Sequence, residues 1–380
     1  MDTETARIYS EHAAEWERRR GAEHVDEART LGARVEPGGV RVDLGCGPGL
    51  HLEALGEPVV GVDVVLPMLE LARARVPDAL LMVADLEALP IRSGALGGAW
   101  AAKSYLHLRR SSVPYALAEL HRSCGVGSPV TLIMRIGTEE GPDTRSEFPG
   151  RLIADWEPAR LRDVVEGAGF DVESVALEGR WARLRARRMR SLPDFVGPDM
   201  TLLVCGLNPS EYAADAGVGF ARPGNRFWPA AAAAGLVRVD RDPICAFREG
   251  LGMTDLVKRA TSRADRLHSA EYERGLERVE RLVRWLEPGG VCFVGLAGWR
   301  TVVNRSAHAG PIPGGFAGRP AYLMPSTSGA NASSTLDDLT EHLREAVTLA
   351  SAQRERSSLA APSRQESSPA RFSSVSRQSW

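Results

Sequence analysis

The sequence predicts two consecutive three-layer α/β domains followed by a disordered tail. Short apolar runs alternate with amphipathic runs in two successive series, which is typical of parallel sheets covered by helices on both faces. The 380 residues also exceed the roughly 250 to 300 that one hydrophobic core supports. A segment rich in proline and glycine, 191–200, separates the two series. We therefore expect domains over 1–190 and 191–350 and a tail over 351–380.

The first series begins at residue 40. Apolar runs occupy 40–46, 58–64, 79–90, 97–108 and 129–137, and an amphipathic run at 66–76 has the period of a helix. A further helix is predicted over 157–170, followed by strand-like runs at 171–179 and 181–189. This order predicts a doubly wound, mainly parallel sheet.

The second series begins with the apolar run at 201–210 and a predicted helix at 227–237. A long amphipathic helix starts near Ser269, and its apolar face is formed by Leu276, Val279, Leu282, Val283 and Leu286. Strands at 291–295 and 321–324 and a final helix over 335–349 complete the domain. The serine-rich tail lacks apolar periodicity, which predicts disorder, and its arginines would favour polyanions.

Composition excludes several classes of protein. Hydrophobic residues make up 43% of the chain and charged residues 25%, and no apolar run has the length needed to cross a bilayer. The charged N-terminal segment lacks the apolar core of a secretory signal, so we expect a protein of the cytoplasm, associated with the nucleoid in a prokaryote. The five cysteines are widely spaced and lack a CxxC pair, which predicts reduced thiols and argues against a zinc site or an iron–sulfur cluster.

A glycine-rich loop follows the first strand-like run. Gly45, Gly47 and Gly49 lie between a strand and a helix, where glycine allows a tight turn and close approach to a ligand. Their GxGxG spacing differs from the GxGxxG of dinucleotide sites. Asp63 ends the second strand-like run, where a carboxylate can accept both hydroxyls of a ribose, and Asp85 ends the third. Three consecutive strand ends therefore carry groups suited to a nucleoside-containing cofactor.

This set of residues resembles the class I S-adenosylmethionine-dependent methyltransferases over about residues 5–190. The resemblance implies S-adenosylmethionine as the cofactor. It places Asp43 and the three glycines near the methionine portion, Asp63 at the ribose and Asp85 at the adenine amino group. A similar loop with another ligand, or with none, stays an alternative.

The methyl acceptor is not identified by these motifs. Tyr9 and Trp16 are candidates for a lid, and Tyr105 and His107 follow the fourth strand, where acceptors approach the methyl group in this fold. Each of the four also fits a packing or surface role. The family often has an acidic residue just before the fourth strand, whereas this chain has glycines at 97 and 98. Methyl transfer is therefore a weaker prediction than the fold.

Two motifs of the second half follow apolar runs: GLNPS at 206–210 and MPSTSGAN at 324–331. Because the carboxyl ends of parallel strands share one edge of a sheet, these motifs can meet in one crevice. Between them, Phe220 lies on a glycine-rich loop, where an aromatic ring can stack on a flipped base. A net charge of −2 predicts no overall basic surface, so DNA contacts must come from a local patch or from backbone amides.

GLNPS, GFARPGNRFW, GMTDLVKRAT and PSTSG together resemble the mismatch-specific uracil/thymine-DNA glycosylases of the uracil-DNA glycosylase superfamily, over about residues 192–347. The resemblance implies double-stranded DNA with a mismatched or damaged pyrimidine as the partner, and hydrolysis without cofactor or metal. Asn208 then positions the attacking water and Phe220 stacks on the extruded base. The remaining positions are Gly206, Ala213 and Ser326 for the base, and Arg222, Ser328, Gly329, Ala330 and Asn331 for the DNA.

The residue types suit this reaction. Cleavage of an N-glycosidic bond passes through an oxocarbenium-like sugar and a departing anionic base, so amide donors facing the base oxygens stabilise the leaving group. An asparagine oxygen orients water without being a strong base. Asn208 therefore predicts slow turnover and dependence on a good leaving group such as uracil.

Departures from the family pattern narrow the expected substrate. Met324 cannot donate a hydrogen bond to the leaving base, and Ala330 is a weak wedge, which predicts a preference for already destabilised pairs. Ala213 leaves room for a substituent at C5 of the pyrimidine, although an alanine on a packed helix face fits equally well. Asn225 and Arg226 are expected mainly to brace their loop.

Three hypotheses follow from the sequence. In the first, the protein is a repair glycosylase with an attached methyltransferase of unknown acceptor. In the second, the C-terminal domain is a DNA-binding module that has lost excision and delivers the methyltransferase to nucleic acid. In the third, methylation of a small metabolite is the principal activity. The presence of Asn208 and Phe220 favours the first over the second.

Overall fold

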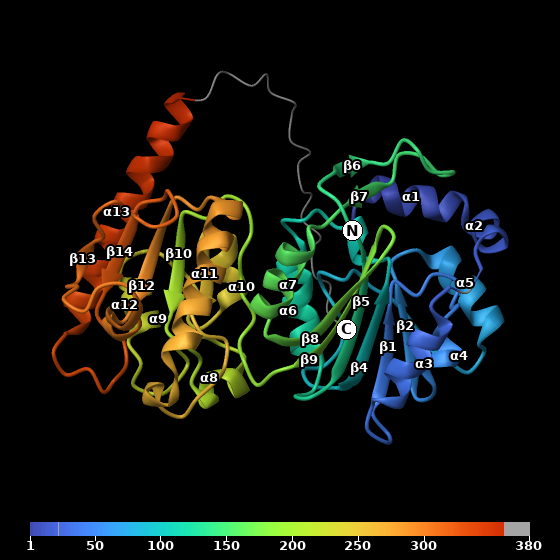
Figure 1. Ribbon diagram of the computed structural model, residues 1–380, viewed down its shortest axis with the longest axis horizontal. Coiled ribbons are helices and arrows are strands. Elements are labelled where there is room, and N and C mark those ends of the chain that lie inside the picture. Colours follow the sequence, from blue (N-terminus) through green and yellow to red (C-terminus); the bar gives the residue numbers. More distant parts are fainter. Residues whose placement is uncertain (22, 361–380) are drawn as a thin grey trace.

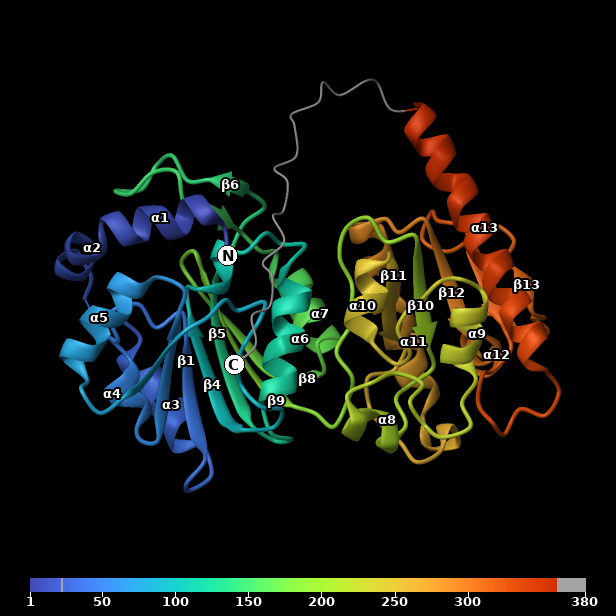
Figure 2. The ribbon, with the colours of Figure 1, turned by 180° about the vertical axis from the view of Figure 1, so that it is seen from behind.

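The computed structural model describes residues 1–21 and 23–360, which form two α/β domains (Figures 1 and 2). Both are mixed α/β structures with mainly parallel sheets, so the predicted fold class is confirmed. The helices of the first domain are α1 (Thr3–Glu11), α2 (Ala13–Arg19), α3 (Val25–Ala33), α4 (Leu52–Leu55), α5 (Leu66–Arg75), η1 (Tyr105–His107), α6 (Val113–Ser123) and α7 (Pro158–Gly167). Its strands are β1 (Val40–Leu44), β2 (Val59–Asp63), β3 (Leu80–Val83), β4 (Leu96–Ala102), β5 (Pro129–Arg135), β6 (Glu140–Pro142), β7 (Leu152–Ala154), β8 (Phe170–Glu178) and β9 (Trp181–Arg188).

The main sheet of the first domain has the strand order β3-β2-β1-β4-β5-β9-β8 in the described residues. Strands β1 to β5 are parallel, and β9 runs antiparallel to both of its neighbours. Alternate side chains of β4 face opposite ways: Ala99 and Ala101 join the cluster with α6 and α7, whereas Trp100 joins the cluster with α3, α4 and α5. The period of two along each strand thus produces the three layers.

The second domain repeats this architecture with a smaller sheet. Its strands are β10 (Leu202–Gly206), β11 (Leu251–Asp255), β12 (Gly290–Val294), β13 (Gly310–Pro311) and β14 (Ala321–Met324). Its helices are α8 (Glu211–Ala216), α9 (Phe227–Ala233), α10 (Pro243–Arg248), η2 (Ala264–Arg266), α11 (Ser269–Leu286), α12 (Leu296–Val302) and α13 (Leu336–Ala360). The strand order among the described residues is β11-β10-β12-β14-β13, with only β13 antiparallel. Leu203 faces α11, and Val204 faces α9 and α13.

Two features of the second domain differ from the sequence prediction. Strand β11 lies within the GMTDLVKRAT motif, to which no strand was assigned. The final helix continues to Ala360 instead of ending at 349, so the first part of the predicted disordered tail is helical. Strong helix formers beyond the packed residue Ala350 account for this extension. The rest of the predicted tail, 361–380, lies outside the described residues.

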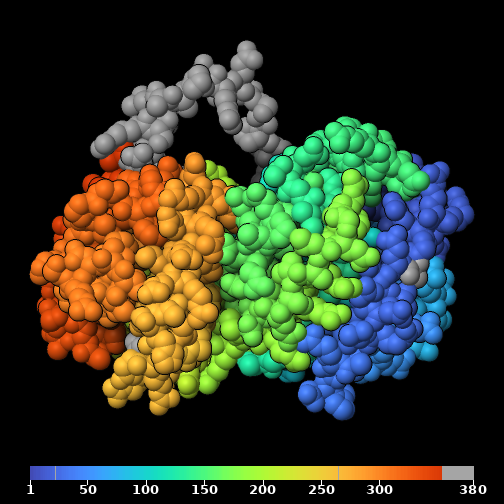
Figure 3. Space-filling model, in the orientation of Figure 1, coloured from blue at the N-terminus to red at the C-terminus, as the bar shows by residue number. Residues whose placement is uncertain are grey.

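The two domains pack side by side, with α6 and α7 facing α10 and α11 (Figures 1 and 3). Trp156 meets Trp285 edge to face, with ring centroids 5.9 Å apart, and Arg281 pairs with Asp163 at 2.6 Å. The connecting segment 191–200 is more than a simple loop. Its Phe195 exchanges two backbone hydrogen bonds with Met253 of β11, so it covers the open edge of the second sheet.

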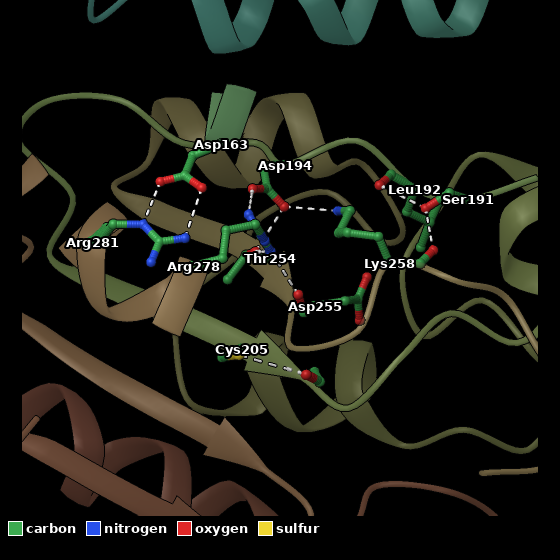
Figure 4. A network of polar contacts seen from close by, with 11 residues as sticks. Asp163, Ser191, Leu192, Asp194, Cys205, Thr254, Asp255, Lys258, Arg278 and Arg281 are labelled. Carbon is green, nitrogen blue, oxygen red and sulfur yellow. Dashed lines mark hydrogen bonds and ion pairs between the residues drawn. The ribbon is translucent and has the colours of Figure 1, made fainter. Parts of the chain in front are cut away.

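A buried carboxylate joins the connecting segment to the second domain (Figure 4). Asp194 is 3% exposed, and it accepts hydrogen bonds from Lys258 Nζ at 2.8 Å, Thr254 Oγ1 at 2.7 Å and Arg278 NH1 at 2.7 Å. Burial alone would raise the pKa of Asp194, but the charges of Arg278 and Lys258 hold it below its usual value. The backbone N–H of Asp194 donates to the carbonyl of Gly167, at the end of α7.

Replacing this carboxylate should destabilise the chain strongly. We expect Asp194→Ala to lower the free energy of unfolding by about 3–5 kcal/mol, because two buried cations lose their shared partner. The control, Asp163→Ala, removes the partner of Arg281, whose side chain is 51% exposed, and should cost about 0–1 kcal/mol. Urea unfolding followed by tryptophan fluorescence measures both, and equal losses would contradict the assigned role of Asp194.

Candidate functional site

The glycine-rich loop and the end of β2 are joined by backbone hydrogen bonds. Gly47 N–H and Val65 N–H each donate to the Asp63 carboxylate at 2.9 Å, so both of its oxygens are oriented by the chain. Gly45 and Gly47 line a cavity of about 310 Å³ together with Asp63. Gly49 lies away from that lining, and a Cβ at this position would lie 3.0 Å from Cβ of Ala72. Its positive φ of 76° and its close packing on α5 explain the glycine.

Asp43 lies beneath this loop with an unsatisfied oxygen. The residue is 1% exposed, and Oδ2 has no hydrogen-bond partner among the described residues. Burial, and then the charge of Asp63, raise the pKa of Asp43 to about 8. A buried carboxylate without a partner is costly, and a cation bound in the loop would compensate it.

The other predicted residues of the first domain have different surroundings. Asp85 lines the cavity, but its carboxylate contacts the N-terminal amine and the backbone N–H of Glu87. Its predicted contact with adenine would require that amine to move. Tyr9, Trp16 and His107 line the cavity, whereas the fully buried Tyr105 belongs to the core between the sheet and α6. Three of the four acceptor-side candidates are thus brought together.

Asn208 follows β10 and has a fixed side-chain orientation. Its Nδ2 donates to the carbonyls of Pro209 at 3.1 Å and Arg259 at 3.0 Å, and to Thr261 Oγ1 at 2.8 Å. Since a carbonyl can only accept, the opposite amide orientation would bring Oδ1 against two carbonyl oxygens. The observed orientation leaves Oδ1 without a partner in the part of the chain that the structure describes. This oxygen can therefore accept a hydrogen bond from water.

Phe220 lies beside the start of the GLNPS motif. Its backbone has a positive φ of 58°, and its ring stacks on Phe227 with centroids 4.2 Å apart and an interplanar angle of 23°. A Cβ at Gly206 would lie 3.4 Å from Cζ of Phe220 and 2.4 Å from Oδ1 of Asp255. Only glycine leaves room for the ring and the carboxylate to approach this point together.

Asp255 was not assigned a role from the sequence, although GMTDLVKRAT was recognised as a motif. It ends β11, directly opposite Gly206 of β10 in the parallel register. A polar residue at the end of a strand next to β10 was the signal that could have identified it. Burial raises the pKa of Asp255 to about 6, and Lys258 is the nearest charge that opposes this shift.

The late motif forms a braced loop at the end of β14. Asn331 Nδ2 donates to the Ser326 carbonyl at 2.7 Å, and Arg226 donates to the carbonyls of Ser328 at 3.1 Å and Asn331 at 2.6 Å. Arg226 therefore braces the loop, as the sequence indicated. Asn331 also has a bracing role, which was not expected of a predicted DNA contact.

The remaining predicted contacts of the second domain differ in exposure. Four of them are exposed at the surface: Arg222, Ser326, Gly329 and Ala330. Ala213 is only 3% exposed and packs within α8. This position agrees with the packing interpretation of Ala213, and its proximity to a base stays a prediction.

The described residues contain neither a metal-binding cluster nor a membrane-spanning helix. No group of three or more His, Cys, Asp and Glu side chains there is arranged to hold a metal ion, and all five cysteines are free thiols. None of the helices described is both long and apolar enough to span a membrane.

Ionisation of Asp255 should lower stability at neutral pH. Because the pKa is raised in the folded chain, to about 6 from 3.8, the contribution to stability is present below pH 4 and is lost as the pH rises through 6. We expect Asp255→Asn to raise the free energy of unfolding at pH 8 by about 1–3 kcal/mol, and by less at pH 5. Urea unfolding at both pH values measures this, with Asp265→Asn, an exposed carboxylate of the same domain, as the control. A gain independent of pH would contradict the shift.

Comparison with known proteins gives one family match for each half of the chain. Residues 42–130 match the family model for a methyltransferase domain, and residues 193–348 match that of the uracil DNA glycosylase superfamily. Similar solved structures include a chain from the complex of the Trm112 methyltransferase activator with a methyltransferase of Haloferax volcanii (17% identity, 49% of this chain and 97% of that chain, TM-score 0.42). Others are an S-adenosylmethionine-dependent methyltransferase of Mesorhizobium loti (20%, 44% and 98%, 0.38) and the 1,6-didemethyltoxoflavin-N1-methyltransferase of Burkholderia thailandensis with bound S-adenosylhomocysteine (16%, 48% and 84%, 0.38). The chain therefore joins a methyltransferase domain to a domain of the uracil DNA glycosylase superfamily.

Proposed function

We propose that the second domain removes uracil or thymine from G·U and G·T mismatches in double-stranded DNA, by hydrolysing the N-glycosidic bond after the base is flipped. The observation that carries this proposal is the fixed amide of Asn208. The two N–H groups of Nδ2 are directed at three acceptors that hold the side chain, and Oδ1 is left as an acceptor at the end of β10. A domain that only bound DNA would not need this orientation.

The proposed reaction uses the side chains on one rim of the sheet. Water held by Oδ1 of Asn208 attacks C1′ of the sugar, the bond from C1′ to the base nitrogen breaks, and the base leaves with the electron pair. The proton released by the water then neutralises the departing base anion. The ring of Phe220 stacks on the flipped base above Gly206, where the absence of a side chain allows close approach. Backbone amides of this rim face the base oxygens and stabilise the negative charge of the leaving group.

We further propose that the first domain binds S-adenosylmethionine. Asp43 supplies a buried carboxylate whose Oδ2 accepts no hydrogen bond among the described residues and lies 3.9 Å from His51 Nδ1, and Asp63 presents two oriented oxygens to the cavity. Gly47 lines the cavity beneath Trp16, whereas Gly45 is required by its close packing on Ser104. When bound, the cofactor supplies an activated methyl group.

The role of Asn208 can be tested by excision from single-mismatch duplexes. We expect Asn208→Ala to abolish product from G·U and G·T duplexes while duplex affinity stays unchanged, because the attacking water loses its acceptor and Asn208 is not one of the proposed DNA contacts. Asn304→Ala, an asparagine in a surface turn of the same domain, should cleave like the wild type. Near-normal cleavage by Asn208→Ala would refute the assignment. Binding without cleavage by the wild type would instead favour a DNA-binding module.

The cofactor proposal has a separate test in S-adenosylhomocysteine binding, measured by calorimetry. Asp63→Ala should weaken binding about tenfold or more, because hydrogen bonds to a charged acceptor are lost. Asp78→Ala replaces an exposed carboxylate between α5 and β3 and should bind normally. No binding by the wild type, or equal binding by Asp63→Ala, would overturn this assignment.

A further inference from the structure

We propose that the cavity of the first domain holds a small organic anion next to the cofactor site, bound by Arg151, and that this anion is the class of molecule the methyltransferase accepts. The inference rests on the proposed binding of S-adenosylmethionine. It adds the chemical class of the second ligand, which the sequence motifs left open.

The cavity is covered by the N-terminal helices. Thr5 Oγ1 of α1 accepts a hydrogen bond from Leu152 N–H of β7 at 2.7 Å, and the hydroxyl of Tyr9 accepts one from Arg151 at 2.6 Å. Trp16 of α2 lies over the glycine loop, 4.0 Å from the position of a Cβ at Gly47. Beneath these helices lies a partly open cavity of about 310 Å³, a size that suits small molecules.

Arg151 is a buried cation that lines this space. It is 6% exposed, and its nitrogens donate only to neutral acceptors: the Phe148 carbonyl at 3.0 Å, the Tyr9 hydroxyl at 2.6 Å and Ser146 Oγ at 2.9 Å. No ion pair joins it to a carboxylate within residues 1–21 and 23–360. Buried arginines are almost always paired with an anion, so this environment lacks a negative charge.

The polar neighbours of Arg151 cannot supply that charge. His107 Nδ1 donates to the Leu152 carbonyl at 2.8 Å, so Nε2 is the atom that accepts the proton of Tyr9 at 2.9 Å. Burial lowers the pKa of His107 to about 4, and burial raises that of Tyr9, so both groups are neutral near pH 7. The pair fixes the tyrosine oxygen toward Arg151 without offsetting its charge.

The arginines that line this cavity differ in their charge compensation. Arg135, Arg151 and Arg180 line it together with Asp143, and Arg135 pairs with the buried Asp155, whereas Arg151 has no ion pair among the described residues. Asp143 lies 4.0 Å from Arg135 and accepts a hydrogen bond from Arg145 N–H at 3.0 Å. An anion bound beside Arg151 would compensate its charge.

The position of this cavity argues against DNA as its ligand. Helices α1 and α2, which cover it, lie at the upper end of the molecule in Figures 1 and 2. Helix α8, which directly follows the GLNPS motif, lies at the lower end of the other domain. A duplex bound at the glycosylase rim would therefore not be presented to the methyltransferase cavity.

The test is a calorimetric titration of the full chain, with and without saturating S-adenosylhomocysteine. The probes are benzoate and phenyl phosphate, which separate a carboxylate from a phosphate ligand, and neutral benzyl alcohol. We expect at least one anion to bind and benzyl alcohol not to bind. Arg151→Gln should weaken anion binding about tenfold or more, and Arg151→Lys should weaken it less. Arg29→Gln, which removes an exposed arginine of α3, should match the wild type.

Each other outcome overturns the proposal. Absence of anion binding by the wild type would do so, as would equal affinity for benzyl alcohol, and neither result depends on a variant that might misfold. Unchanged anion affinity in Arg151→Gln would remove Arg151 from the site. Displacement of a bound anion by a short duplex would indicate a nucleic-acid ligand instead. Loss of S-adenosylhomocysteine binding alone refutes the cofactor proposal. Because the anions are also titrated without S-adenosylhomocysteine, failure of the cofactor proposal can be told apart from failure of the anion proposal.

Discussion

A single buried carboxylate sets the arrangement of this chain. Lys258, after β11, and Arg278, in the middle of α11, bring two positive charges into the interior of the second domain, and Asp194 compensates both. This carboxylate comes from the connecting segment, whose backbone is in turn held by the end of α7 in the first domain. Because unpaired buried charges are strongly unfavourable, the second domain packs correctly only with the connecting segment in place. The network also supports the strand end that carries Asp255, and so connects the domain junction with the candidate base site.

The contact between the domains also fixes the positions of the two candidate sites. The paired tryptophans and the Asp163–Arg281 ion pair extend the contact along α7 and α11, so the domains share one continuous seam (Figure 3). Each sheet nevertheless presents the carboxyl ends of its strands at its own end of the molecule. The methyltransferase cavity lies beneath helices α1 and α2, whereas the loops that follow β10 and β14 lie at the surface, so a duplex can approach them. A covered cavity suits a small ligand and surface loops suit a macromolecule, in agreement with the two proposed activities.

The candidate sites were predictable to the extent that they depend on strand ends. Parallel strands place their carboxyl ends on one edge, so the motifs at Asp63 and Asn208 could be assigned to crevices before any side-chain position was known. Asp255 was missed because no strand was assigned to its motif, and Arg151 was missed because nothing in its neighbouring residues distinguishes it from an ordinary surface charge. Their importance comes from burial and from missing or distant partners. The bracing role of Asn331 was not predicted, since only the folded loop shows which carbonyl its amide reaches, and its contact with DNA stays a prediction.

The sequence by itself determined the order of elements, the two doubly wound sheets, the glycine turn and the strand-end residues, since periodicity and turn chemistry depend on residues close together in the chain. Only the tertiary structure decided which charges are compensated and which spaces are enclosed. Asp194 meets Arg278 across 84 residues and Tyr9 meets Arg151 across 142, so neither contact has a signature in the local sequence. Ala350, the last residue of the predicted domain, is buried against Gly290 of β12, and the strong helix formers after it continue α13 to Ala360. Burial and charge compensation depend on contacts between residues that are far apart in the sequence, so they can be assigned only from the folded chain.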